Sequence, residues 1–274
     1  LSNTKVIYTA HGFHFYKGAP LKNWLIYYPI EKWLSKYTEC LITINSEDYN
    51  TAIEKKFKAK SIEKINGVGV DLSKFYPVSE KEKIQLRKKH NFNENDFILI
   101  YPAELNKNKN QLLLIEVIDI IKDKIPNIKL ILAGTGELFN YYRKKVVKKG
   151  LEKYIVFTGY RTDIDELIKL SDVSVASSIR EGLPVNILEA MACGLPVVAT
   201  RNRGHNELVI NRVNGFLVNI NNKNEFANSI YQLFLNKNKR IKMGKKSLSL
   251  VKKYSINTIV NEVHKIYIKC LSKK

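Results

Sequence analysis

The sequence predicts an α/β protein built on a doubly wound parallel sheet, preceded by part of a second sheet of the same kind. From about residue 95 onward, short apolar runs rich in β-branched residues alternate with helical patterns. The runs are apolar at successive positions, so helices are expected to cover both faces of each strand. The length of 274 residues leaves room for more than one domain. Alternation of this kind is typical of doubly wound domains.

The second part of the chain carries this alternation most clearly. Buried strands are expected at 97–101, 129–133, 155–158 and 173–176, with a last strand at 196–199. Helices are expected between them at 111–123, 137–149, 163–170 and 185–193. Four successive strand–helix repeats predict one complete doubly wound domain.

The first part of the chain is shorter. It predicts strands at 6–9, 41–44 and 61–65 and an aromatic-rich helix at 21–36. Each βαβ unit needs about 30 residues or more, so this part is too short for a whole doubly wound domain. We therefore expect residues 1–70 to be the rear half of an N-terminal domain whose first half is absent. The glycines of the Asn66–Asp71 segment suit a turn or a hinge.

The end of the chain predicts an amphipathic helix. Apolar side chains recur at helical spacing from Ile256 to Leu271, and lysines lie on the opposite face. Such a helix usually buries its apolar stripe on a domain rather than in a membrane. The expected organisation is therefore a partial N-terminal domain at 1–70, a complete domain at 71–254, and a helix at 255–274 that packs back on the N-terminal part.

The charge of the chain is strongly positive. Lysine and arginine number 46 against 26 acidic residues, which gives a formal net charge of +20. An anionic partner would explain this balance, and so would a compositional bias toward lysine. The basic helix faces have no aromatic platform and no recognised nucleic-acid motif, so no nucleic-acid partner is expected. The remaining candidates for an anionic partner are a phosphorylated small molecule and a membrane surface.

Cysteine usage and hydropathy indicate where the chain works. Cys40, Cys193 and Cys270 are odd in number and widely spaced, so neither a disulfide framework nor a metal site is indicated. A reducing, cytoplasmic compartment fits best. The sequence has no apolar run of about 18 residues, so no transmembrane helix is expected.

The segment after the strand at 173–176 carries the clearest chemical signal. It leaves the carboxyl edge of the expected sheet, where doubly wound folds bind ligands. Pro184 suits the first turn of a helix, whose free N–H groups can receive a phosphate. Glu181 precedes this helix and Glu189 lies about one turn inside it, so the two carboxylates could hold different parts of one ligand. Alternatively, Glu181 caps the helix and Glu189 is a surface charge.

The same segment resembles a known signature. Residues 178–200 fit Ser-x-x-Glu-Gly-Leu-Pro-x-x-x-Leu-Glu-Ala-Met-Ala-x-Gly-x-Pro-Val-Val-Ala-Thr, which is similar to the pattern of retaining family 4 glycosyltransferases of GT-B fold. Further matches follow in the family's order at 9–18, 66–71, 134–138 and 157–164. The first of these resembles members that build bacterial capsule and exopolysaccharide. The resemblance covers nearly the whole chain and implies two Rossmann-like domains.

The resemblance implies a donor site in the second domain. Glu181 would contact hydroxyls of the donor sugar and Glu189 the ribose. The backbone at Gly182, Leu183, Pro184 and Val185 would receive the sugar and its diphosphate. The donor would be a nucleotide-sugar, with a UDP-sugar favoured.

The resemblance also implies residues around the diphosphate and the base. Lys109 matches the family's phosphate lysine, a fixed cation that would stabilise charge on the leaving diphosphate. Its usual arginine partner is replaced by Glu104, and Arg161 or Arg180 is a candidate to compensate. Gly134 belongs to the Gly-x-Gly loop, and Tyr160 with Arg161 would flank the base. These are the donor-binding residues that the resemblance predicts.

His11 matches the family histidine near the reacting sugar, so His11 and Glu181 are the expected catalytic residues. Transfer with retained configuration needs no obligatory metal in this family, and no other cofactor is expected. Asp163-Ile164-Asp165 does spell a metal-binding pattern of other glycosyltransferases. However, Asp163 followed by Glu166 is also a capping box, which is the preferred interpretation.

The sequence therefore predicts a retaining glycosyltransferase, a hexosyl- or N-acetylhexosaminyltransferase, for a glycan or lipid-linked acceptor in cell-surface polysaccharide synthesis. One alternative is a fragment that binds nucleotide-sugar without transferring it, and another is an epimerase or hydrolase of the same fold. The aromatic and basic stretch 24–33 suits either a membrane surface, at the inner face of the cell membrane, or packing in a core.

Overall fold

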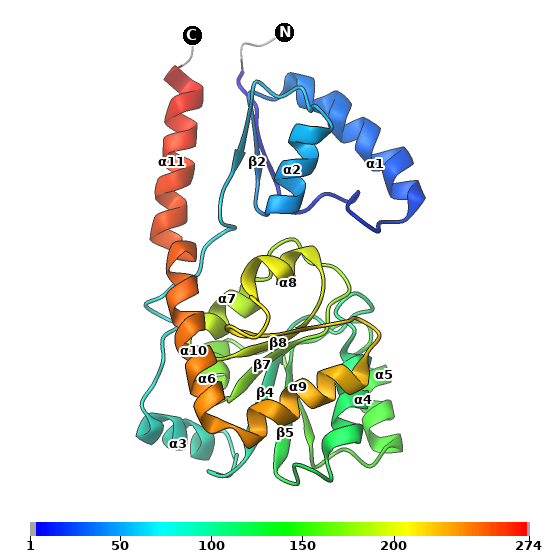
Figure 1. Ribbon diagram of the computed structural model, residues 1–274, viewed down its shortest axis with the longest axis vertical. Coiled ribbons are helices and arrows are strands. Elements are labelled where there is room, and N and C mark those ends of the chain that lie inside the picture. The colour runs from blue at the N-terminus through cyan, green and yellow to red at the C-terminus, as the bar shows by residue number, and fades with distance from the viewer. Residues whose placement is uncertain (1–3, 273–274) are drawn as a thin grey trace. The chain divides into compact units, whose positions relative to one another are not determined.

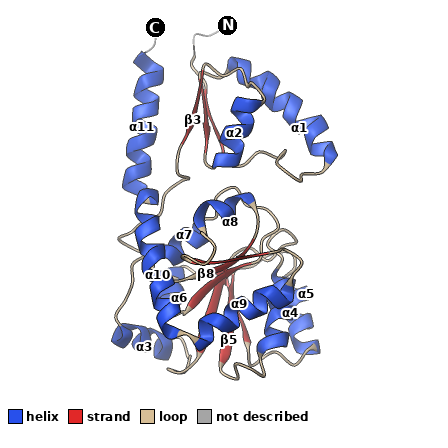
Figure 2. Ribbon diagram, viewed as in Figure 1, coloured by secondary structure: helices blue, strands red, loops and turns tan. Residues whose placement is uncertain are grey.

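The computed structural model describes residues 4–272 and divides into two compact units. The first unit comprises Leu1–Gly69, Glu181–Leu183 and Lys253–Lys274, and the second comprises Val70–Arg180 and Pro184–Lys252. Residues 1–3 and 273–274, which fall in the domain ranges expected above, lie outside the described residues. Each unit is an α/β structure with a parallel sheet (Figures 1 and 2).

The first unit has a three-stranded parallel sheet in the order β1-β2-β3. Its strands are β1 (Ile7–Ala10), β2 (Cys40–Thr43) and β3 (Ser61–Lys64). Its helices are α1 (Leu21–Leu34), the 3₁₀ turn η1 (Ser35–Tyr37), α2 (Ser46–Glu54) and α11 (Ile256–Ser272). Figure 1 shows α1 and α2 on one side of this sheet and α11 on the other.

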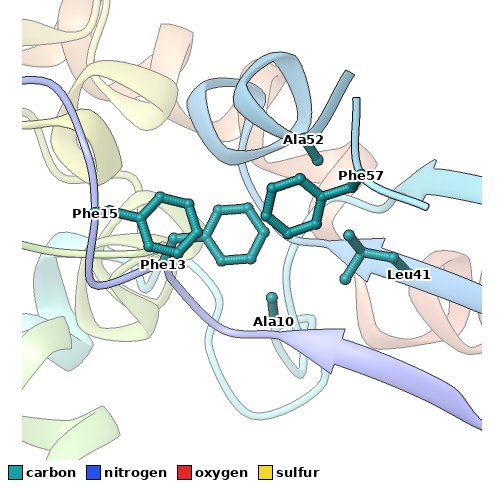
Figure 3. Packing of buried hydrophobic residues seen from close by; sticks show 6 residues of the cluster. All are labelled: Ala10, Phe13, Phe15, Leu41, Ala52 and Phe57. Atoms are coloured by element: carbon teal, nitrogen blue, oxygen red, sulfur yellow. The ribbon is translucent and has the colours of Figure 1, made fainter. Parts of the chain in front are cut away.

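The two faces of this sheet bury different cores because alternate strand residues point to opposite sides. Toward α1 and α2, Leu41 joins an aromatic cluster in which the rings of Phe13 and Phe15 stack at 4.7 Å and Phe13 and Phe57 at 5.5 Å (Figure 3). Toward α11, the neighbouring β2 residues Cys40 and Ile42 pack against Ile259 and Cys270. The amphipathic terminal helix thus buries its stripe within the first unit.

The second unit has six parallel strands in the order β6-β5-β4-β7-β8-β9. They are β4 (Phe97–Pro102), β5 (Ile128–Ala133), β6 (Ile155–Gly159), β7 (Val173–Ala176), β8 (Val197–Thr200) and β9 (Gly215–Val218). The inner strands are almost wholly buried, whereas the edge strand β6 is half-buried. The chain runs outward from β4 to β6 and returns to β7, so β4 and β7 meet at the point where strand order reverses.

The helices of the second unit follow the strands. They are α3 (Glu80–Lys89), α4 (Gln111–Ile121), α5 (Phe139–Lys148), α6 (Ile164–Lys169), α7 (Val185–Ala192), α8 (Arg203–Leu208), α9 (Lys223–Leu235), α10 (Lys237–Val251) and the 3₁₀ turn η2 (Lys252–Tyr254). None of the helices described for residues 4–272 is long and apolar enough to cross a bilayer.

The expectation that the strand near 196–199 is the last one was wrong. A further strand, β9, pairs in parallel with β8 from Val197↔Gly215 to Thr200↔Val218. A Cβ at Gly215 would overlap the carbonyl oxygen of Val197, so this register needs glycine at the first position of β9. A four-residue run that opens on glycine after a polar turn carries too weak a strand pattern to be recognised.

Candidate donor-binding site

The candidate site lies at the carboxyl edge of the six-stranded sheet, where β4 and β7 are neighbours. The loops that follow these strands, residues 103–110 and 177–184, leave the same edge because the strands are parallel. Helices α4 and α7 begin directly after these loops. Ligands of doubly wound sheets bind at this reversal of strand order.

Hydrogen bonds hold the two loops together. The N–H of Ile179 donates to the carbonyl of Asn108 at 2.8 Å, and the Asn108 side-chain amide donates to the carbonyl of Arg180 at 3.0 Å. The buried Ser177 hydroxyl donates to the carbonyl of Lys109 at 2.7 Å. The backbone of the sequence-predicted phosphate lysine is therefore fixed from the β7 side.

An exposed acid, Glu104, stands where the resemblance implies the arginine partner of Lys109. The Glu104 carboxylate accepts a hydrogen bond from the Asn106 side-chain amide at 2.9 Å, and its carbonyl accepts one from Gln111 at 2.8 Å. Glu104 thus adds a negative charge to the loop that carries Lys109.

Arg161 is already engaged by a neighbouring acid. Its guanidinium forms a two-point ion pair with Asp163, and this pairing lowers the pKa of that carboxyl. The expected capping box was wrong, because the side chain of Asp163 binds Arg161 and does not cap α6, although Asp163 does stand at its N-cap position. Tyr160, beside Arg161, is 79% exposed. Its ring is open to stack on a base.

The Gly-x-Gly loop after β5 packs directly on the loop after β4. The N–H of Leu105 donates to the Thr135 carbonyl at 2.8 Å, and the N–H of Leu138 donates to the Leu105 carbonyl at 3.0 Å. Gly134 and Gly136 have φ of +149° and +154°, and a Cβ at either would run into the 103–105 backbone. Both glycines are required for this close approach.

Gly136→Ala is expected to destabilise the second unit by roughly 2–3 kcal/mol, since the new Cβ would lie 2.5 Å from the Leu105 carbonyl oxygen at a strained φ. Gly150→Ala is the matched control, because Gly150 also has positive φ but no atom within 4 Å of the added Cβ. Urea unfolding of both variants measures the difference. Equal losses of stability would show that the close approach of the loops is not what requires glycine.

Helix α7 begins where the sequence predicts. Pro184 occupies its N-cap position and Val185 its first turn, and no side chain caps it, so Glu181 is not a helix cap. Glu189, inside α7, is half-buried. Burial raises the pKa of its carboxyl to about 7, with Asp165 adding to the rise and Lys74 opposing it. Among residues 4–272, no side chain or backbone group donates a hydrogen bond to this carboxylate.

His11 and Glu181 belong to the first unit. Glu181, Gly182 and Leu183 group there, and a Cβ at Gly182 would overlap the carbonyl oxygen of His11. His11 itself is exposed. Lys109, Gly134, Tyr160, Arg161, Pro184, Val185 and Glu189 belong to the second unit. The predicted site residues are therefore divided between the two units.

One cluster has the composition of a metal site. Donor atoms of His90, Asp163 and Glu166 lie within 4.8 Å of one another. However, Lys89 contacts both Glu166 oxygens at 2.7 Å, His90 contacts one at 2.8 Å, and Arg161 covers Asp163. The carboxylates already have cationic partners, and the cluster is an ion-pair network that joins α3 to α6.

Two residues that build the site were not singled out from the sequence. Ser177 anchors the Lys109 backbone, and the Asn186 side chain donates to the carbonyl of Pro102 at 2.8 Å, which ties α7 to the end of β4. Both are small polar residues in a loop or first helical turn, where such residues are common for local reasons. Their role depends on strand order, which no local pattern reveals.

Comparison with known proteins identifies the family. Residues 82–249 match the family described as "Glycosyl transferases group 1". The chain is 50% identical over 264 residues to a protein of Bacillus subtilis (strain 168) named as glycosyltransferase EpsD, covering 96% of this chain and 69% of that protein. It is 31% identical over 259 residues to the UDP-Gal:alpha-D-GlcNAc-diphosphoundecaprenol alpha-1,3-galactosyltransferase of Escherichia coli, covering 93% and 64%.

Solved structures share the fold. The Anabaena protein Alr3699/HepE in complex with UDP superimposes with a TM-score of 0.85 at 22% identity, over 97% of this chain and 72% of that one. Sucrose-phosphate synthase from Thermosynechococcus elongatus gives 0.84 at 20% identity, over 100% and 69%. The chain thus has the Rossmann-like α/β architecture of GT-B proteins, and it belongs to the group 1 glycosyltransferase family.

Proposed function

We propose that this chain binds a nucleoside diphosphate sugar, preferably a UDP-sugar, and transfers the sugar with retained configuration to a glycan or lipid-linked acceptor. The observation that carries the proposal is Glu189. It presents a half-buried carboxyl group that no described residue satisfies, beside the loops at the reversal of strand order. Buried acceptors are normally hydrogen-bonded, and the two hydroxyls of a ribose would satisfy this one.

The diphosphate has suitable partners nearby. The N–H groups of Val185 and Asn186 lie in the first turn of α7, where N–H groups have no acceptor within the helix. Pro184 has no N–H group. Lys109 adds a full positive charge on a loop fixed by Ser177. Its charge would offset the negative charge that develops on the departing diphosphate. In this proposal Tyr160 stacks on the base, and Glu181 and His11 contact the donor sugar.

The names of the relatives support a proposal for the acceptor and the location. One relative is named for an acceptor carried on diphosphoundecaprenol. By that likeness, we infer that the acceptor is a lipid-linked or growing surface glycan, in capsule or exopolysaccharide synthesis, and that the chain works at the inner face of the cell membrane. A fixed lysine and helix N–H groups can assist departure of the diphosphate, so no metal is assigned to the reaction.

The direct test is incubation of the chain with UDP-glucose, UDP-galactose and their N-acetyl counterparts, with and without a GlcNAc-diphospholipid acceptor. Mass spectrometry of the acceptor and of free nucleotide measures the outcome. Acceptor-dependent release of UDP with a gain of one sugar on the acceptor is expected. Release of UDP without acceptor would identify a hydrolase, an isomerised sugar would identify an epimerase, and binding without turnover would identify a donor-binding fragment.

A further inference from the structure

Helix α1 is apolar on two opposite sides. One side packs in the core of the first unit, where Trp24 and Tyr28 lie against Phe15 at ring distances of 5.5 and 5.4 Å. The other side carries Ile26, Ile30 and Trp33, at spacings of four and three residues, and Tyr37 follows four residues later at the end of the 3₁₀ turn η1. These four residues together form the outer stripe. Their exposed fractions are 53, 51, 56 and 58%. Four large apolar side chains on one exposed face mark an interaction surface, not ordinary surface variation.

Lysines border the outer stripe. Lys22 and Lys36 are exposed, and the Lys36 ammonium lies 4.7 Å from the ring centres of both Trp33 and Tyr37. Glu31 is the only acidic residue in 21–37, and it is half-buried, where it accepts a hydrogen bond from the Tyr8 hydroxyl at 3.2 Å. The stripe is therefore apolar at its centre and positively charged at its edges.

We propose that the outer stripe docks the first unit on a bilayer surface that contains anionic phospholipid, with α1 lying in the plane of the interface. Tryptophan and tyrosine rings settle at the level of the head groups, isoleucines reach the acyl boundary, and lysines meet lipid phosphates. A second copy of the chain fits less well, because apposed stripes would bring the lysines of both copies together.

This inference rests on the proposed function for its biological use, since a docked first unit would hold the chain beside a lipid-linked acceptor. Membrane binding itself requires no donor and no turnover. Failure of one is therefore distinguishable from failure of the other.

Cosedimentation with vesicles tests the docking surface. The chain is expected to bind mixed phosphatidylglycerol–phosphatidylcholine vesicles and to bind phosphatidylcholine vesicles far more weakly. Lys22→Gln with Lys36→Gln should weaken binding about thirtyfold, and Ile30→Ser with Trp33→Ser about tenfold or more. The matched controls, Lys242→Gln with Lys246→Gln and Leu235→Ser with Val147→Ser, alter exposed residues of the second unit and should bind as the unmodified chain does.

Fluorescence tests the orientation of α1, because the chain has two tryptophans and they lie on opposite sides of this helix. In Trp24→Phe, the remaining Trp33 should shift to the blue and be quenched by brominated lipid when anionic vesicles are added. In Trp33→Phe, the remaining Trp24 should change little. Circular dichroism checks that each variant is folded.

Three results would overturn the proposal: equal binding to neutral and anionic vesicles, unchanged binding in both stripe variants, or quenching of Trp24 in place of Trp33. A concentration-dependent dimer that the stripe substitutions abolish, without vesicle binding, would instead assign the surface to a second copy. UDP-sugar binding should be the same in the stripe variants and the unmodified chain, which separates this test from that of the proposed function.

Discussion

Replacing Glu189 by glutamine is expected to weaken UDP-sugar binding about ten- to hundredfold, because the half-buried carboxylate that would accept the ribose hydrogen bonds is lost. The substitution keeps the size of the side chain. It also relieves the cost of burying a charge, so the free energy of unfolding should not fall. A loss of affinity without a loss of stability separates a ligand contact from a structural role.

The pH dependence gives a second signature of the same residue. Burial raises the pKa of the Glu189 carboxyl to about 7 in the free chain, and two ribose hydroxyls donate best to the ionised form. Binding must then release a proton below pH 7. Affinity should fall about tenfold for each pH unit below that pKa and level off above it.

Isothermal titration with UDP-glucose measures this profile, because its diphosphate diester does not titrate in the same range. Glu189→Gln should bind weakly with a flat profile. Glu116→Gln, which alters a partly exposed acid of α4 that pairs with Lys223, should keep the profile of the unmodified chain. A flat profile in the unmodified chain would remove Glu189 from the ribose contact.

Lys109→Ala is expected to lower the transfer rate at saturating donor about hundredfold, with a smaller loss of about tenfold in UDP affinity. The lysine carries a fixed charge on a loop held by Ser177. Glu104 contributes a negative charge to the same loop, and Arg161 pairs with Asp163. Neither residue can therefore supply the positive charge of Lys109. The rate should therefore depend on Lys109 more strongly than the affinity does.

Lys107→Ala is the matched control for Lys109, since Lys107 is an exposed lysine two residues away in the same loop. Steady-state kinetics with varied UDP-sugar separates the effect on rate from that on binding. If the two alanine variants lose the same activity, Lys109 contributes only general positive charge and the proposed contact with the diphosphate is contradicted.

The parts of the fold with strong local patterns were predictable. The strands at 97–101 and 173–176 are buried apolar runs, and the structure confirms them as β4 and β7 with ends within one residue of the prediction. The terminal helix was confirmed as α11 because its apolar stripe keeps helical spacing for 17 residues. Weak patterns were missed. The helix α3 is dominated by charged and polar residues, and β9 is short and opens on glycine.

The sequence also located the start of α7 and the close approach of the Gly-x-Gly loop, since proline and glycine impose local geometry. It could not show that Glu189 is half-buried with a raised pKa, because that depends on neighbours from α6 and the 70–79 segment. Nor could it assign the partner of Arg161. The local pattern predicted that Asp163 caps α6, whereas its carboxylate pairs with the Arg161 guanidinium.

The sequence also could not show which aromatic side chains of α1 are buried and which are exposed. From the sequence, packing in a core and contact with a membrane were equally good interpretations of residues 24–33. The structure divides the stretch, with Trp24 and Tyr28 inward and Trp33 outward, and only the packing side is settled by contacts within the first unit.

The most direct test of the donor-site assignment is a crystal structure of the chain soaked with UDP. We expect UDP at the carboxyl edge of the sheet between the loops after β4 and β7, with both ribose hydroxyls within hydrogen-bond distance of the Glu189 carboxylate and the diphosphate against Lys109 and the start of α7. UDP bound elsewhere, or bound there with the ribose turned away from Glu189, would contradict this assignment.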